Sequence, residues 1–148
     1  MLFYSDGGIF ASSCTPYQDS YEGRPGNRIC ITVKFGDLPA TTAIVDTGAP
    51  YCVLSREQIV ATHPNYKYEA IGEVTLQMAG ILPHGVIVRW PITLLAEKGQ
   101  DLTIEGIVFV PDDDVNIPNF VGLDGCLSRI RFGVDAQKNM FFFGPVEM

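Results

Sequence analysis

The chain of 148 residues has a formal net charge of -7 and a pI of about 4.6, and 47% of its residues are hydrophobic. A chain of this length forms one domain with a substantial core, because it buries roughly 68–70% of its unfolded surface. The acidic balance lacks the basic stripe that is typical of nucleic-acid-binding proteins, so we expect no nucleic-acid partner.

Residues 1–28 are rich in glycine, serine and proline, and we expect an irregular N-terminal arm there, followed by one domain over residues 29–148. The arm does not resemble a signal peptide, because no basic region precedes an apolar run. No stretch approaches the 18 uninterrupted apolar residues of a membrane span, so we expect no membrane partner.

The cysteine pattern argues against a structural zinc site, because no two cysteines form a C-x-x-C pair. The chain is long and apolar enough to fold without disulfides, so we expect free, buried thiols in a reducing compartment. We therefore expect a cytoplasmic protein with no metal and no other cofactor. The cysteines are Cys14, Cys30, Cys52 and Cys126.

Beyond the arm, the sequence favours short strands that are rich in β-branched residues and separated by turn signals such as Gly36-Asp37. Strands are predicted at residues 29–35, 41–45, 74–78, 86–90, 92–95, 102–110, 131–134 and 140–143. This spacing is typical of an all-β barrel or sandwich. Ser55 and Gln58 fit a capping box that predicts one short helix, and a second helix is expected near Asp124 and through Ile130.

One short segment suggests chemistry, since the apolar strand Ala43-Ile44-Val45 leads directly into Asp46-Thr47-Gly48-Ala49. A β-turn alone would account for the aspartate and the glycine, but it gives no reason for the threonine between them. A second apolar segment that ends in glycine, Phe120-Val121-Gly122, lies 76 residues downstream, counted from Asp46 to Gly122.

These two segments resemble the active-site motif and the second signature of retropepsin-like aspartic proteases. Their spacing suits a single-lobe protease and is too short for the two-lobed pepsin type. The resemblance covers about residues 24–144, and Arg24-Pro25 is similar to bacterial members of the family. It implies an all-β, closed acid-protease barrel with one or two short helices that forms a two-fold homodimer. In such dimers the terminal strands share a sheet, which would bury Phe141-Phe142-Phe143.

The resemblance also implies roles for individual residues. Asp46 would be the catalytic carboxylate, Thr47 would hydrogen-bond across the dimer, and Gly48 would let the substrate main chain approach closely. Residues 80–85 would form the tip of a flap that closes over the substrate. The residues expected to contact substrate are Ala49, Gly80, Ile81, Leu82, Val121 and Gly122.

The sequence departs from the viral members of the family at two places. Acidic residues follow the motif in the viral enzymes, whereas Pro50 and Tyr51 follow it here. The flap of the viral enzymes has a glycine-rich tip, whereas this segment contains Pro83 and His84. Both departures affect how substrate is held rather than the catalytic centre.

Hydrolysis of an amide needs an activated water and a protonated leaving nitrogen, and two carboxylates that share one proton supply both. The chain has a single D-T-G, so the second carboxylate would be Asp46 of another copy. The sequence therefore predicts a homodimeric aspartic endopeptidase that acts on an extended peptide or protein substrate.

Two alternatives remain open at the level of sequence. The first is a catalytically inactive version of the fold that serves as a dimerisation or peptide-binding module, since fold does not fix function. The second is an unrelated β-barrel that binds small molecules and uses D-T-G only as a turn.

The remaining polar and aromatic residues have ordinary interpretations. His63 and His84 lack metal-ligand spacing, and we expect His63 at a helix end and His84 in the flap. The Asp112-Asp113-Asp114 run is typical of a solvated loop. Cys52 is expected in the core, because no base lies near it in the sequence, and Trp90 in the core or at an interface.

Overall fold

Strands dominate the fold of this computed structural model, which describes residues 1–146 apart from residues 25, 63–68, 79 and 114. The strands are β1 (Leu2–Phe3), β2 (Ile9–Ala11), β3 (Ser13–Pro16), β4 (Cys30–Phe35), β5 (Thr41–Val45), β6 (Cys52–Val53), β7 (Ala70–Thr75), β8 (His84–Leu94), β9 (Leu102–Pro111), β10 (Phe120–Val121), β11 (Ile130–Asp135) and β12 (Met140–Pro145). The helical elements are α1 (Arg56–Thr62) and the 3-10 turn η1 (Leu127–Arg129).

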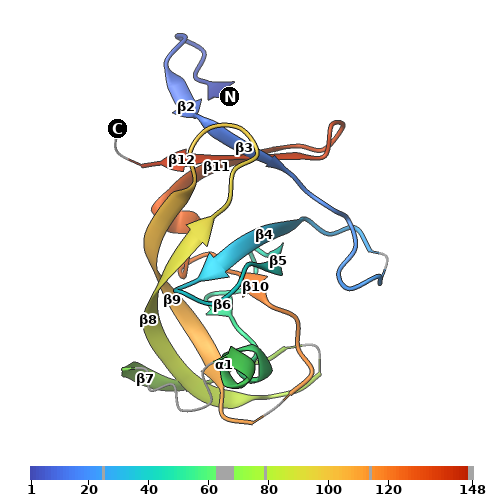
Figure 1. Ribbon diagram of the computed structural model, residues 1–148, viewed down its shortest axis with the longest axis vertical. Helices are drawn as coiled ribbons and strands as arrows, with labels where there is room; N and C mark the ends of the chain where they lie inside the picture. Colours follow the sequence, from blue (N-terminus) through green and yellow to red (C-terminus); the bar gives the residue numbers. More distant parts are fainter. Residues whose placement is uncertain (25, 63–68, 79, 114, 147–148) are drawn as a thin grey trace.

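Six strands close into a barrel, in the order β4-β5-β10-β6-β9-β8, and the pairing of β4 with β8 closes the ring. Strand β7 pairs with β8 outside this ring and extends the sheet to seven strands. The pairings β5–β10 and β6–β9 are parallel, whereas the others in the barrel are antiparallel. Figure 1 shows the barrel between α1 at one end and a second, smaller sheet at the other. The expected all-β closed barrel is confirmed.

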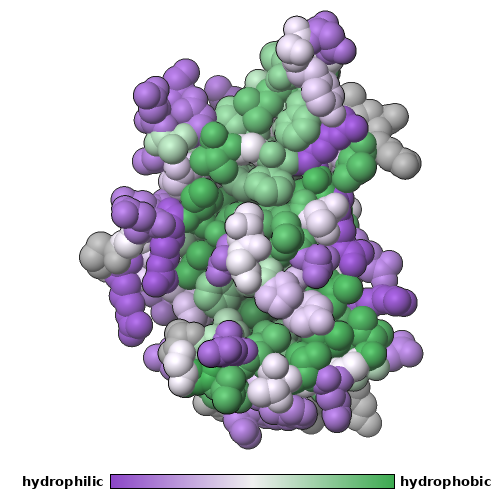
Figure 2. Space-filling view, turned by 180° about the vertical axis from the view of Figure 1, so that it is seen from behind, coloured by the Kyte–Doolittle hydropathy of each residue, from purple (hydrophilic) through white to green (hydrophobic). Residues whose placement is uncertain are grey.

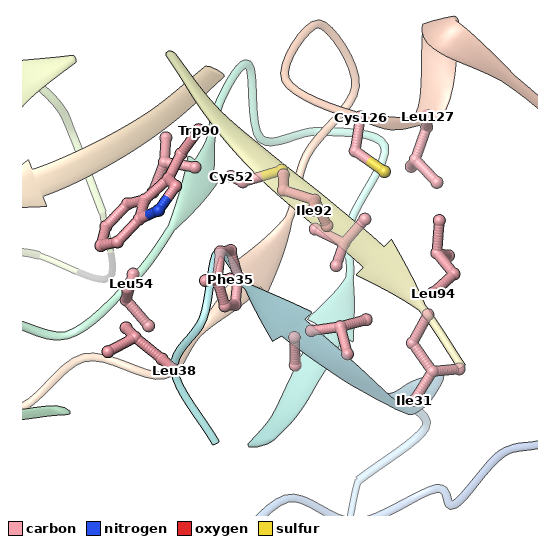
Figure 3. Packing of buried hydrophobic residues seen from close by; sticks show 14 of the residues in the cluster. Ile31, Phe35, Leu38, Cys52, Leu54, Trp90, Ile92, Leu94, Cys126 and Leu127 are labelled. Atoms are coloured by element: carbon pink, nitrogen blue, oxygen red, sulfur yellow. The ribbon is translucent and has the colours of Figure 1, made fainter. Parts of the chain in front are cut away.

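Alternating burial explains why β4 forms a wall of the barrel. Ile31, Val33 and Phe35 are buried, whereas Thr32 and Lys34 between them are exposed. This period of two is that of a strand with one face on the core. Figure 3 shows the core inside the barrel, where Phe35 lies among aliphatic side chains from neighbouring strands. Trp90 is one of these buried residues, as the sequence analysis expected.

The turn after β4 requires a glycine for two reasons. Gly36 has a φ of 58°, which side chains rarely adopt. A Cβ at this position would also lie 2.1 Å from Nε1 of Trp90. The predicted turn at Gly36-Asp37 is therefore fixed both by the backbone conformation and by the indole ring packed against it.

Strand β8 is longer than predicted, because it joins the two expected strands at residues 86–90 and 92–95 through Pro91. Its first half pairs with β7 up to Val88, and its last residues pair with β4 from Ile92 onward. In the stretch between them β9 is the ladder neighbour, and on the other side the carbonyl of Pro91 accepts from the N–H of Gly36 at 2.7 Å, just beyond the end of β4. The proline therefore lies where the ladder with β4 ends, a position at which a strand tolerates a residue without an N–H.

A second sheet of three strands has the order β11-β12-β3. Strand β12 is its centre, and Phe141 and Phe143 are fully buried within one chain. The expectation that a dimer sheet would bury this segment is therefore wrong, because both edges of β12 are already paired in the same chain.

The N-terminal arm is also more regular than expected. Its composition favours turns, yet β1 and β2 form a hairpin and β3 pairs with β12, so pairing with the rest of the fold overrides the local preference. The hydroxyl of Ser13 fastens β3 from the other side, since it donates to the carbonyl of Gln100 at 2.7 Å. The boundary at residue 28 between arm and domain stays a prediction.

Both helical elements lie where the sequence predicted them, but the second is shorter than predicted. Helix α1 follows Ser55 as predicted, whereas the second helix is reduced to the single turn η1, because Ile130 already begins β11. Across the described ranges, no helix is long and apolar enough to cross a membrane. The four cysteines are free and buried, as predicted.

Substitution at β12 tests the burial pattern of the second sheet. We expect Phe141→Ala to lower the free energy of unfolding by about 3–5 kcal/mol, because a fully buried ring is lost. Phe142→Ala is the matched control and should cost clearly less, because that ring is only half-buried. Urea unfolding at one fixed protein concentration measures both losses. Equal losses would contradict the assigned register.

Candidate active site

The D-T-G segment begins where β5 ends, beside a parallel strand from the distant second signature. Strand β10 pairs with β5 so that Phe120 faces Ile44 and Val121 faces Val45. The ladder continues into the loop, since the N–H of Asp46 donates to the carbonyl of Val121 at 3.0 Å. The second signature therefore fixes the point at which the aspartate leaves the sheet.

The carboxylate of Asp46 is held by its own loop. The N–H of Gly48 donates to Oδ1 of Asp46 at 2.8 Å, and the N–H of Ala49 donates to the aspartate carbonyl at 3.2 Å. This is an Asx-type turn, in which the side chain of an aspartate accepts from the backbone two residues on. Asp46 is half-buried and Thr47 is exposed, so the carboxylate is oriented and still accessible.

The far side of the loop is fastened to the chain that follows the second signature. The carbonyl of Ala49 accepts from the N–H of Leu123 at 2.7 Å, and the carbonyl of Pro50 accepts from Asp124 and Gly125 at 2.8 and 3.1 Å. The two segments approach so closely that a Cβ on Gly122 would lie 2.2 Å from the carbonyl oxygen of Tyr51. Gly122 is therefore required by packing.

A pocket of about 500 Å³ opens beside Asp46. Its wall is mostly apolar, and Asp46 supplies its only carboxylate among the residues that the structure describes. Three segments form it, namely the loop after β5, the end of β7 and the chain before β10. The lining residues are Asp46, Gly48, Ala49, Pro50, Tyr51, Val53, Thr75, Leu76, Gln77, Met78, Ile117, Pro118 and Phe120.

The residues expected from sequence fall into three groups. Asp46, Gly48 and Ala49 line the pocket, whereas Thr47 lies next to it and faces solvent. Val121 and Gly122, which were expected to contact substrate, are buried and pair with or pack against the loop from behind. Their position favours support of the loop that carries Asp46. Gly80, Ile81 and Leu82 are exposed and do not line the pocket.

The hairpin of β7 and β8 stands over one side of the pocket and has a short tip. Met78 and Ile81 form the last bridge, with N–H to carbonyl distances of 2.9 and 2.8 Å in the two directions, and Gly80 has a φ of 83°. The tip is therefore narrower than the expected residues 80–85. Gly85 is already part of β8, where a Cβ would lie 2.3 Å from the carbonyl oxygen of Val110.

An ion pair links the base of this hairpin to the end of β9. Nδ1 of His84 lies 2.5 Å from Oδ2 of Asp112, and the N–H of Asp112 donates to the carbonyl of His84 at 3.0 Å. The hydrogen bond with Asp112 raises the pKa of His84 above its usual value, and the charge of Glu73 acts in the same direction. Asp112, the first residue of the acidic run, therefore pairs with the hairpin, whereas Asp113 is exposed as expected for a solvated loop.

Sequence reasoning missed most of the apolar wall. Tyr51 was noticed close after the first signature and Phe120 as the first residue of the second, and these positions were the signal that could have assigned both to the pocket. The contribution of Thr75, Leu76, Gln77 and Met78 depends on how the hairpin folds back, which no local pattern reports. His63, Pro25, Ala79 and Asp114 lie outside the described residues. No group of three or more metal-binding side chains occurs in the part that is described.

Gly122→Ala tests the close approach of the two signature segments. We expect the free energy of unfolding to fall by about 1–3 kcal/mol, because the added methyl group meets backbone atoms that cannot turn aside. Gly8→Ala is the matched control, since its Cβ would meet only side chains of Asp6 and Tyr4, and it should change stability by no more than about 0.5 kcal/mol. Thermal and urea unfolding of both variants measure the difference. A neutral Gly122→Ala would contradict the packing described.

The ion pair between His84 and Asp112 should make the stability of the fold depend on pH. Because the folded-state pKa of His84 is raised, the pair stabilises the fold fully below the unfolded pKa, and this contribution is lost as the pH rises through the folded pKa. Asp112→Asn should lower the pKa of His84, whereas the control Asp113→Asn should leave it nearly unchanged. An NMR titration of the imidazole measures each value. An equal fall in both variants would count against the specific pair.

Comparisons with known proteins address the fold. No protein-family model matches the sequence, and no curated protein matches it. Among solved structures, the fold is similar to the crystal structure of a retropepsin-like aspartic protease from Rickettsia conorii, with a TM-score of 0.56 over 88% of this chain and 89% of that chain. The two sequences are 17% identical. The chain therefore has the retropepsin-like fold that its two signature segments indicated.

Proposed function

We propose that the chain is an aspartic endopeptidase that works as a homodimer, with Asp46 of each copy in one active site. The observation that supports this most directly is the placement of Asp46. Its carboxylate is held by the N–H of Gly48 at the edge of an apolar pocket, on a loop that the second signature fastens from two sides.

The need for a second copy follows from the pocket itself. A water attacks an amide efficiently when one carboxylate takes its proton and another protonates the leaving nitrogen. No second carboxylate lines the pocket in the described chain. Asp124, the nearest aspartate after the second signature, is exposed and follows the segment that backs the loop. A two-fold axis beside Asp46 would supply the missing group from an identical surface.

The surface around the loop is suited to such a contact. Thr47 and Leu123 are both exposed, and Leu123 is hydrogen-bonded through its N–H to Ala49 of the catalytic loop. A hydroxyl and a leucine side chain beside the carboxylate would give a partner copy one polar and one apolar contact. Figure 2 shows that apolar side chains also gather over the centre of one face of the molecule, with hydrophilic residues mainly around them.

The reaction proceeds by addition of water to the peptide carbonyl. Like charges roughly 3 Å apart cannot both ionise, so the pair holds one proton. The ionised Asp46 takes a proton from water as the water oxygen bonds to the carbonyl carbon, and the protonated Asp46 donates to the carbonyl oxygen. The C–N bond then breaks as one carboxyl of the pair donates a proton to the leaving nitrogen, and the other carboxylate takes a proton from a hydroxyl of the tetrahedral intermediate, which re-forms the carbonyl. Each cycle therefore restores the shared proton.

The shape of the pocket favours particular substrates. Tyr51, Met78 and Phe120 give it an apolar wall next to the carboxylate. A large apolar side chain beside the scissile bond would bury its surface there, and the main chain of an extended peptide would lie between the loop and the β7–β8 hairpin. The preferred substrate is therefore an extended, apolar stretch of peptide or protein.

Asp46→Asn tests the mechanism. We expect peptide hydrolysis to fall by roughly 10²–10⁴-fold or more, because neither proton transfer remains. Asp124→Asn should retain activity, since its side chain does not line the pocket. Products from a diverse peptide mixture, identified by mass spectrometry between pH 4 and pH 7, provide the readout, and the parent should show a bell-shaped pH dependence.

The same variants test the dimer. Excess Asp46→Asn protein added to the parent should lower its activity, because mixed dimers hold one carboxylate. Sedimentation at the assay concentration should show a dimer. Full activity of a monomer would rule out the shared site. A confirmed dimer without hydrolysis by the parent would favour the peptide-binding module instead.

A further inference from the structure

The N-terminal arm forms a loop after Gln18 that contacts the strands of the candidate active site. The two ends of this loop meet at a bridge, where Gln18 and Cys30 exchange two backbone hydrogen bonds of 3.1 and 2.9 Å. Within it, Tyr21 and Arg24 form a second bridge around the turn Glu22-Gly23, whose φ angles are 49° and 76°. Positive φ at both central positions is the mark of a tight two-residue hairpin turn. Two backbone bridges and a tight turn therefore define the position of Tyr21 against the rest of the fold.

The ring of Tyr21 packs behind the site. It is buried together with Cys30 and Ile44, and Phe120 packs against this cluster. Ile44 lies in β5 two residues before Asp46, and Phe120 lies in β10 and lines the pocket. One aromatic ring from the arm therefore supports both strands of the parallel pair that delivers the catalytic loop.

The hydroxyl of Tyr21 completes the hydrogen bonding of Asn119, the residue just before β10. The N–H of Asn119 donates to Oη of Tyr21 at 3.2 Å, and its carbonyl accepts from the N–H of Ile44 at 2.9 Å. Asn119 is 1% exposed, so this N–H would have no water to replace the hydroxyl. Burial raises the pKa of Tyr21, partly offset by the bond from Asn119, so the phenol stays neutral.

The side chain of Asn119 is fixed from the opposite direction. Its Oδ1 accepts from the N–H of Ser55 at 3.0 Å, and its Nδ2 donates to Oε1 of Gln58 at 3.1 Å and lies 3.3 Å from the hydroxyl of Thr41. Because α1 and β5 hold the side chain of Asn119, its backbone N–H is the group through which the arm contacts this residue. Tyr21 is the partner found for it in the described chain.

We propose that Tyr21 is a positioning residue of the catalytic loop, acting through Asn119 and β10 on Asp46, so that the turn which carries Tyr21 is part of the active site. The path is short, because the N–H of Asp46 binds the carbonyl of Val121, two residues after Asn119. The effect on reaction rate rests on the proposed peptidase function, whereas the effect on loop geometry does not.

Tyr21→Phe removes only the hydroxyl and keeps the ring. A hydrogen bond of this kind contributes roughly a 3- to 10-fold change in an equilibrium. We therefore expect amide hydrogen exchange, followed by NMR, to become about 3- to 10-fold faster at Asn119. The amides of Asp46 and Ala49 should shift in the same direction, while the core amide of Val33 stays as in the parent. Tyr4→Phe is the matched control, because Tyr4 lies exposed beside the β1–β2 hairpin.

The kinetic readout separates positioning from general stability. In Tyr21→Phe, kcat should fall by roughly the same 3- to 10-fold with KM unchanged, because the substrate pocket remains and the carboxylate is less well aligned. Unchanged exchange at Asp46 and Ala49 together with an unchanged kcat would overturn the proposal, and so would equal acceleration at every amide including Val33. A parent without peptidase activity would refute the proposed function, and the exchange rates alone would then decide the positioning role.

Discussion

The parallel pairing of β5 with β10 determines where the loop that carries Asp46 leaves the sheet. It consists of only two residue pairs, extended by one hydrogen bond into the loop at Asp46. A pairing this short is not stable alone, and the structure surrounds it with further backbone bonds from the segment after Gly122. The absence of a side chain at Gly122 lets the two segments touch. The geometry of the carboxylate is thus a property of two distant segments together.

A buried polar residue holds this pairing in place at its other end. Asn119 would be costly to bury without partners, because a desolvated amide and a desolvated N–H both lose their bonds to water. Here the arm, β5 and α1 provide partners for its backbone and its side chain. No buried side-chain nitrogen or oxygen within the described ranges lacks a partner. A satisfied polar group of this kind selects one arrangement of the surrounding elements, which a purely apolar contact does less strictly.

The sequence predicted the parts of the fold that depend on local patterns. The alternation in β4, the turn at Gly36 and the start of α1 after Ser55 were read from residues close together in the chain, and the two signatures identified Asp46 and Gly122. The N–H of Ser55 itself binds the distant Asn119. The sequence did not predict β3, the continuity of β8 through Pro91, or the contact of Tyr21 with Asn119. Each of these is decided by pairing with another segment, namely β12, β9 and Asn119. Local propensity is weak wherever such a partner exists.

The continuity of β8 has a mechanical consequence. One strand forms both the inner side of the β7–β8 hairpin and, through Ile92 to Leu94, the seam with β4 that closes the barrel. The hairpin cannot move as an independent loop, because its backbone continues into that seam. A tilt of its tip bends β8 between Val88 and Ile92, where β9 is its ladder neighbour, or loads the three residue pairs of the seam. A force applied to the hairpin is thus transmitted to the wall of the barrel.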